Sequence, residues 1–84
     1  MKENKINVEL IVPSVGQRYS LFIPVNKTVG EVIKILNNII DEITGCFPQN
    51  NHLCILDVFE NVIYNSDVEI INSGMKNGSL LALI

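Results

Sequence analysis

Residues 77–84 read NGSLLALI, an Asn-Gly pair followed by a short apolar run that reaches the last residue of the sequence. An Asn-Gly pair before an apolar run is typical of a tight turn that leads into a β-strand. The run from Leu80 to Ile84 contains no polar residue, which favours a strand flanked by other strands over a strand at the margin of a sheet. We therefore predict that this final strand lies inside a sheet and contributes to the core.

Length and composition indicate a single globular domain, residues 1–84. A chain of this size buries only about 60–65% of its unfolded surface, so most apolar positions must serve the core. Apolar residues make up 48% of the chain and charged residues 18%, which is typical of a compact domain rather than a disordered segment. The net charge of −3 argues against binding to nucleic acid or to an anionic membrane surface.

The sequence predicts a cytoplasmic protein without direct membrane insertion. Glu9 interrupts the start of the chain where a signal peptide would need an apolar core. The longest apolar run, residues 80–84, is far shorter than the roughly 20 residues of a membrane span. Two cysteines are fewer than a disulfide-built secreted domain of this size would carry, so we expect both to be thiols.

Alternating apolar residues predict a hairpin at the start of the chain. Residues 5–12, KINVELIV, have the period of a half-buried strand, and residues 13–16, PSVG, supply turn chemistry in which Gly16 can take a positive φ. The return strand, residues 19–25, contains Pro24, which lacks the N–H that a central strand donates. We therefore expect the second strand to form an edge of the sheet.

Residues 28–45, TVGEVIKILNNIIDEITG, predict a capped amphipathic helix. Thr28 and Glu31 form a capping box at its start, and Gly45 can close the last turn in the left-handed conformation. Apolar residues at spacings of three and four form one stripe: Val29, Val32, Ile33, Leu36, Ile40 and Ile43.

The second half of the chain predicts shorter strands. Residues 46–51 are interpreted as a loop, residues 52–58 as a third strand, and residues 62–64 as a short fourth strand after a turn. Residues 65–78 are interpreted as polar turns around Val68, Ile70 and Met75. The order strand, strand, helix, strand, short strand, strand predicts an α+β fold in which one helix packs on one face of a mixed four- to five-stranded sheet.

This order of elements resembles the β-grasp fold of ubiquitin over essentially the whole chain. Residues 25–28, VNKT, resemble the start of the ubiquitin helix, and Gly45-x-x-Pro48 with the polar run into Leu53 resembles its exit. Three residues fall where that fold places inward side chains: Met75, Leu81 and Leu83. The resemblance implies a single ubiquitin-like domain.

Residues 74–84, GMKNGSLLALI, are also similar to the YukD or EsaB family, the small ubiquitin-like proteins that accompany type VII (WXG-type) secretion machinery in Gram-positive bacteria. This resemblance implies a non-catalytic accessory or regulator of such a system that binds other proteins. Ubiquitin and the related sulfur carriers work through a diglycine, whereas no Gly-Gly follows Ile84. Two alternatives stay open. One is a sulfur or conjugation carrier truncated before a diglycine, and the other is a small effector subunit or detached domain of a larger protein.

The cysteine and histidine residues do not form a pattern that predicts a catalytic, cofactor or metal site. Cys46, His52 and Cys54 lie close in sequence, but a structural zinc site needs more ligands than these and the chain has no other Cys or His. A Cys–His nucleophile pair would also need an orienting group and a cleft. We therefore expect a protein that is not an enzyme.

The candidate functional surface is the face of the sheet that points away from the helix. If Leu53, Ile55, Leu81 and Leu83 face the helix, strict alternation turns a second set outward: Cys54, Leu56, Leu80, Ala82 and Ile84. Exposed apolar residues on neighbouring strands commonly mark a docking surface, and the matching face of ubiquitin is its principal recognition surface. The expected partner is a protein, with components of the secretion machinery and a second copy of the chain as candidates.

Two further expectations concern this surface. Ile11 and Phe22 are predicted to form a second apolar spot beside it. The alternative to the docking interpretation is a bulge near Asp57 that turns Leu56 inward and leaves a smaller patch without significance.

Overall fold

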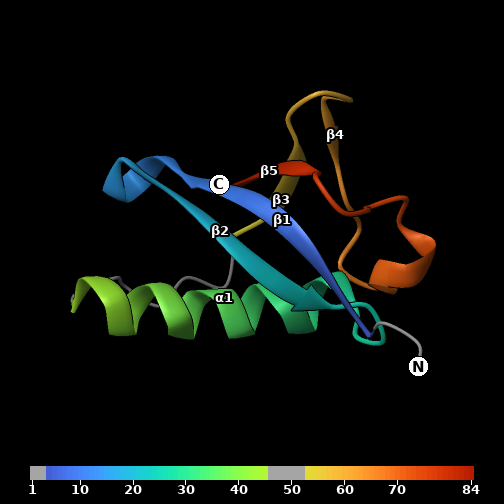
Figure 1. Ribbon diagram of the computed structural model, residues 1–84, viewed down its shortest axis with the longest axis horizontal. Coiled ribbons are helices and arrows are strands. Elements are labelled where there is room, and N and C mark those ends of the chain that lie inside the picture. The colour runs from blue at the N-terminus through green and yellow to red at the C-terminus, as the bar shows by residue number, and fades with distance from the viewer. Residues whose placement is uncertain (1–3, 46–52) are drawn as a thin grey trace.

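A computed structural model describes residues 4–45 and 53–84. Within these ranges, one helix packs against one face of a five-stranded sheet with the strand order β2-β1-β5-β3-β4 (Figure 1). The strands are β1 (Lys5–Val12), β2 (Gln17–Pro24), β3 (Ile55–Asp57), β4 (Val62–Ile63) and β5 (Leu80–Leu83), and the helix is α1 (Val29–Thr44). Two short 3₁₀ turns lie at Pro13–Val15 and Ile70–Asn72.

The final strand occupies the centre of the sheet, as its sequence predicts. β5 runs parallel to β1 and antiparallel to β3. The turn before it is fixed to β1, because the backbone N–H of Asn7 donates to Asn77 Oδ1 at 2.8 Å and the N–H of Gly78 donates to the Asn7 carbonyl at 2.9 Å. Gly78 has a φ of +90°, which a glycine adopts without strain. The predicted α+β, β-grasp architecture is therefore confirmed.

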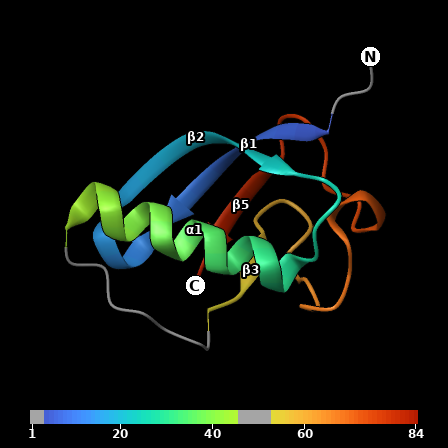
Figure 2. The ribbon, with the colours of Figure 1, turned by 90° about the horizontal axis from the view of Figure 1, so that it is seen from below.

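The N-terminal hairpin also agrees with its prediction. β1 and β2 pair in continuous antiparallel register from Lys5↔Pro24 to Val12↔Gln17, and β2 is an edge strand. Gly16 takes the predicted positive φ at the turn. The inward side chains of β1 are buried against α1, which lies in front of the strands in the view of Figure 2.

The ends of α1 are defined by its predicted caps. The Glu31 N–H donates to Thr28 Oγ1 at 3.2 Å, and the Thr28 N–H donates to Glu31 Oε1 at 2.9 Å, which completes the capping box. Gly45 is left-handed, and its N–H donates to the Asp41 carbonyl at 2.7 Å. The prediction that Ile43 belongs to the buried stripe is wrong, because its side chain is 57% exposed. The last turn of α1 lies at the margin of the sheet, where strands no longer cover it.

Replacing Thr28 with alanine is expected to destabilise the domain by about 1 kcal/mol, because the N–H of Glu31 loses its side-chain acceptor. Urea denaturation measures this change as a lower midpoint at an unchanged slope. Thr28→Ser keeps a hydroxyl at the same place and should restore most of the loss. Equal midpoints for the alanine variant and the wild type would contradict a structural role for this cap.

The segment between β4 and β5 is anchored to the start of α1. The N–H groups of Val29 and Gly30 donate to the carbonyls of Val68 and Ser66 at 2.8 and 2.9 Å. A Cβ atom at Gly30 would lie 3.2 Å from the Ser66 carbonyl oxygen, so glycine allows the two backbones to approach. Ile70 from this segment is fully buried. A stretch that its composition predicts to be polar turns therefore contributes to the core and closes the helix N-terminus.

The core lies between α1 and the facing side of the sheet. β3 is shorter than the predicted strand at residues 52–58, although the backbone groups of Cys54 and Ile84 exchange hydrogen bonds of 2.8 and 2.9 Å next to it. Residues 46–52, including the predicted loop and His52, lie outside the described residues. The buried cluster comprises Val8, Leu10, Val12, Ile23, Val29, Val32, Leu36, Ile40, Ile55, Ile70, Met75, Leu81 and Leu83.

The only α-helix in residues 4–45 and 53–84 is too short and too polar to cross a membrane.

Candidate docking surface

The two sides of β5 face different surroundings. Leu81 and Leu83 point into the core with Ile55 of β3. The register Ile55↔Leu83, Leu56↔Ala82, Asp57↔Leu81 continues without interruption, so Leu56 shares the opposite face with Ala82. The proposed bulge near Asp57 that would turn Leu56 inward is therefore wrong, because the pairing through Asp57 is regular.

Apolar residues form a band across the open face of the sheet. One row crosses four strands through the pairs Ile11↔Ala82, Ala82↔Leu56 and Leu56↔Ile63. The predicted residues Leu80, Cys54 and Ile84 lie on the same face by alternation, and Ile84 is 46% exposed. We call the following residues the open-face patch: Ile11, Cys54, Leu56, Ile63, Leu80 and Ile84.

Ala82 is on the predicted face but is not exposed. Its side chain retains only 5% exposure. The reason is its central position, since Ile11 and Leu56 flank it on the two neighbouring strands and both have larger side chains. Ala82 can therefore set the shape of the patch, but it offers little surface to a partner.

Ile63 belongs to the patch although the sequence alone did not place it there. This residue is 57% exposed and lies directly opposite Leu56. The sequence predicts a short strand at this place, and pairing Ile63 with Leu56 would have put Ile63 on the open face. The predicted spot of Ile11 with Phe22 is wrong. Ile11 pairs with Arg18, four positions from Phe22 on β2, a separation of about 13 Å along the strand.

The part of β2 beside Ile11 and Glu9 is polar on the open face, whereas Phe22, 63% exposed, lies on the same face farther along β2. Arg18 Nε and Glu9 Oε2 form an ion pair of 2.9 Å between β2 and β1, and both side chains are exposed. Such pairs add little stability at a surface. The pair instead borders the open-face patch beside Ile11.

Asp57 organises the turn between β3 and β4. Asp57 is a buried residue, and its carboxylate accepts hydrogen bonds from the N–H groups of Phe59 and Glu60 at 3.1 and 3.0 Å and from the Tyr64 hydroxyl at 2.9 Å. The hydrogen bond from the Glu60 N–H, together with those from Tyr64 and Phe59, holds the pKa of Asp57 below its ordinary value. Burial and the bond to Asp57 raise the pKa of Tyr64 to about 12. The hairpin is thus tied around an ionised carboxylate.

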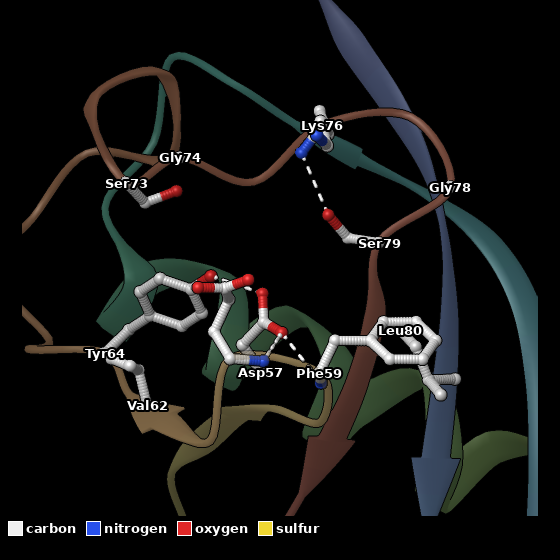
Figure 3. A pocket seen from close by; sticks show the side chains of 11 residues that line it. Asp57, Phe59, Val62, Tyr64, Ser73, Gly74, Lys76, Gly78, Ser79 and Leu80 are labelled. Atoms are coloured by element: carbon white, nitrogen blue, oxygen red, sulfur yellow. Dashed lines mark hydrogen bonds between the residues drawn. The ribbon is translucent and has the colours of Figure 1, made fainter.

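A hollow of about 590 Å³ opens between this hairpin and the turn that precedes β5. Figure 3 shows Asp57 between Tyr64 and Phe59, with Ser73, Lys76 and Ser79 on the opposite side. Leu80 lines the hollow and is also a member of the open-face patch. The two features therefore meet at Leu80, whereas Asp57 and Val62 have the opposite strand parity from the patch.

The structure offers no group for metal binding in its described part: residues 4–45 and 53–84 contain no cluster of three or more potential ligand side chains. Among the three residues considered as metal ligands, Cys54 lies half-buried on the open face. Cys46 and His52 fall outside the described residues.

Solved structures of ubiquitin-like domains share this fold. The ubiquitin-like domain of EccD1, a type VII secretion system protein of Mycobacterium tuberculosis, aligns with a TM-score of 0.72 and 14% identity over 98% of this chain and 99% of that domain. The ubiquitin-like domain of Plasmodium falciparum Dsk2 aligns with a TM-score of 0.65 and 20% identity over 95% and 99% of the two chains. A protein described by its molecular mimicry of SUMO, which promotes DNA repair, gives a TM-score of 0.79 at 15% identity over 100% and 95%.

No protein-family model matches the sequence, and no curated protein matches it. The structural similarities, at these low identities, show that the chain has a ubiquitin-like β-grasp fold. One of the similar domains comes from a type VII secretion protein.

Proposed function

We propose that the protein is a non-catalytic, ubiquitin-like interaction module that docks on a protein partner through the open-face patch. The observation that carries this proposal is the apolar band across β1, β5, β3 and β4, on the face that α1 leaves uncovered. Ile63 and Ile84 expose about half of their surface there. Contiguous apolar residues of this kind are typical of docking surfaces.

We further propose that the partner belongs to a type VII secretion system and that the protein is its cytoplasmic accessory or regulator. The similarity in fold to the EccD1 domain over nearly the whole of both chains supports this role. The resemblance of residues 74–84 to the YukD or EsaB family supports it independently of the fold. Affinity would come from burial of apolar surface at about 25 cal/mol per Å², less the cost of association.

Aspartate on the open-face patch is expected to prevent docking. Ile84→Asp and Ile63→Asp each place a charge in the proposed interface and should weaken binding by at least about thirtyfold, the effect of losing a hot-spot residue. The wild type and variants would be titrated by calorimetry against purified cytoplasmic domains of the type VII apparatus from the same organism. Both side chains are largely exposed, so the variants should stay folded.

Ile43→Asp is the matched control, because it makes the same change at an exposed isoleucine on α1, away from the open face. This variant should bind like the wild type. Equal affinity for Ile84→Asp, Ile63→Asp and the wild type would contradict docking through the patch. Wild-type protein that binds none of the secretion domains would contradict the type VII role, and sedimentation would reveal whether a second copy occupies the patch instead.

A further inference from the structure

The hollow beside the open-face patch has an acidic side. Asp57 and Glu60 both line it. The Asp57 carboxylate is committed to three hydrogen bonds within the hairpin. The Glu60 carboxylate has no hydrogen bond or ion pair with any residue in the ranges 4–45 and 53–84. One carboxylate therefore remains available among the residues that line the hollow.

The hollow also has apolar lining residues. Phe59, two residues after Asp57 in the hairpin turn, lines the hollow and is 76% exposed. Leu80 lies on the Phe59 side of the lining and Val62 on the Tyr64 side (Figure 3). A hollow lined by carboxylates, an aromatic ring and aliphatic side chains suits the side chain of arginine or lysine, whose stem is apolar and whose head is cationic.

Several backbone N–H groups on the opposite side already donate to acceptors within the protein. Those of Met75 and Lys76 donate to Ser73 Oγ and Ser79 Oγ at 3.1 and 3.0 Å. Those of Gly78 and Ser79 donate to backbone carbonyls. Lys76 is the one cation among the residues that line the hollow, against two carboxylates. The balance of charge among the lining side chains therefore favours a cationic occupant.

We propose that this hollow binds an arginine or lysine side chain of the segment that docks on the open-face patch. The partner segment then combines apolar residues, which cover Leu56 and Ile63, with a basic residue that reaches Glu60 and Phe59. This inference rests on the proposed docking function for its apolar part and adds the chemistry of the partner.

Three capped peptides with the same apolar residues around one variable position test the proposal. The variable residue is arginine, norleucine or glutamate, and each peptide is titrated into ¹⁵N-labelled protein at low ionic strength, where charges are weakly screened. The arginine peptide should bind tightest and shift the amides of Phe59, Glu60 and Gly74. Glu60→Gln should weaken it two- to fivefold, the range of about one exposed ion pair, and leave the norleucine peptide unchanged.

Two further variants sharpen the result. Lys76→Gln removes the cation from the hollow and should strengthen binding of the arginine peptide by about twofold. Glu42→Gln removes an exposed carboxylate on α1 and should change nothing. Equal binding of the arginine and glutamate peptides, equal effects of the Glu60 and Glu42 variants, or no shifts with the arginine peptide would each overturn the proposal.

The same spectra separate this inference from the proposed function. Shifts at Leu56 and Ile84 with all three peptides, without a preference for arginine, would overturn the basic site and leave docking through the patch supported. Shifts confined to the hollow with the arginine peptide would support the basic site and count against the patch.

Discussion

Leu81→Ala is expected to lower the free energy of unfolding by about 2–5 kcal/mol, the usual cost of truncating a buried leucine. Leu81 is fully buried in the central strand, opposite Leu10 of β1 and Asp57 of β3. A domain of this length has a total stability of about 4–13 kcal/mol, so the variant should lose a large share of it. Urea denaturation followed by circular dichroism measures the change.

Leu80→Ala is the matched control, because it truncates the adjacent residue of the same strand. Leu80 is only half-buried and faces the open side of the sheet, so its truncation should cost about 1 kcal/mol. Equal losses for the two variants would contradict the assignment of Leu81 to the core and Leu80 to the open face.

Asp57→Ala is expected to cost about 2–3 kcal/mol, because it leaves the Phe59 and Glu60 N–H groups and the Tyr64 hydroxyl without their charged acceptor. Tyr64→Phe removes only one of these hydrogen bonds and should cost about 1 kcal/mol. Both values follow from urea denaturation near neutral pH. A smaller loss for Asp57→Ala than for Tyr64→Phe would contradict the central role of the carboxylate.

The same carboxylate gives the stability a dependence on pH. Because folding lowers the pKa of Asp57, its contribution is present above the unfolded value of 3.8 and is lost as the pH falls through the lower folded value. The raised pKa of Tyr64 acts at the other end: its contribution is present below pH 10.0 and is lost as the pH rises through about 12. Urea midpoints at acidic pH should fall less steeply for Asp57→Asn than for the wild type.

The features that the sequence predicts well depend on neighbouring residues. The Thr28–Glu31 capping box and the Gly45 cap are each set by residues within four positions, so local chemistry determines them. The Asn77-Gly78 turn is also indicated by its own two residues, although hydrogen bonds with Asn7 fix it to β1. The central place of β5 can also be predicted from its own residues, because an apolar run would be poorly covered at the edge of a sheet.

The features that the sequence misses depend on distant contacts. Ile43 fits the apolar stripe of α1, but the sheet does not extend over the last turn. Ala82 has the outward parity of its strand, yet two larger neighbours from other strands cover it. Ile63 joins the patch only through the register of β4. No pattern in a single strand reports what lies on the strands beside it.

The hollow lay beyond sequence analysis for the same reason. Its walls come from the β3–β4 hairpin and from the turn before β5, which lie far apart in the chain. One signal was available: an aspartate at the end of a strand commonly accepts N–H groups two and three residues later, as Asp57 does. The consequence, a fixed turn that leaves Phe59 exposed, required the structure.

The most direct test of docking through the open face is a chemical-shift map of ¹⁵N-labelled protein with a type VII secretion domain that binds it. The docking proposal predicts that the largest changes occur at the amides of Leu56, Ile63, Leu80 and Ile84, with those of α1 nearly unchanged. Changes concentrated on α1 or along the free edge of β2, with the open face unaffected, would contradict it.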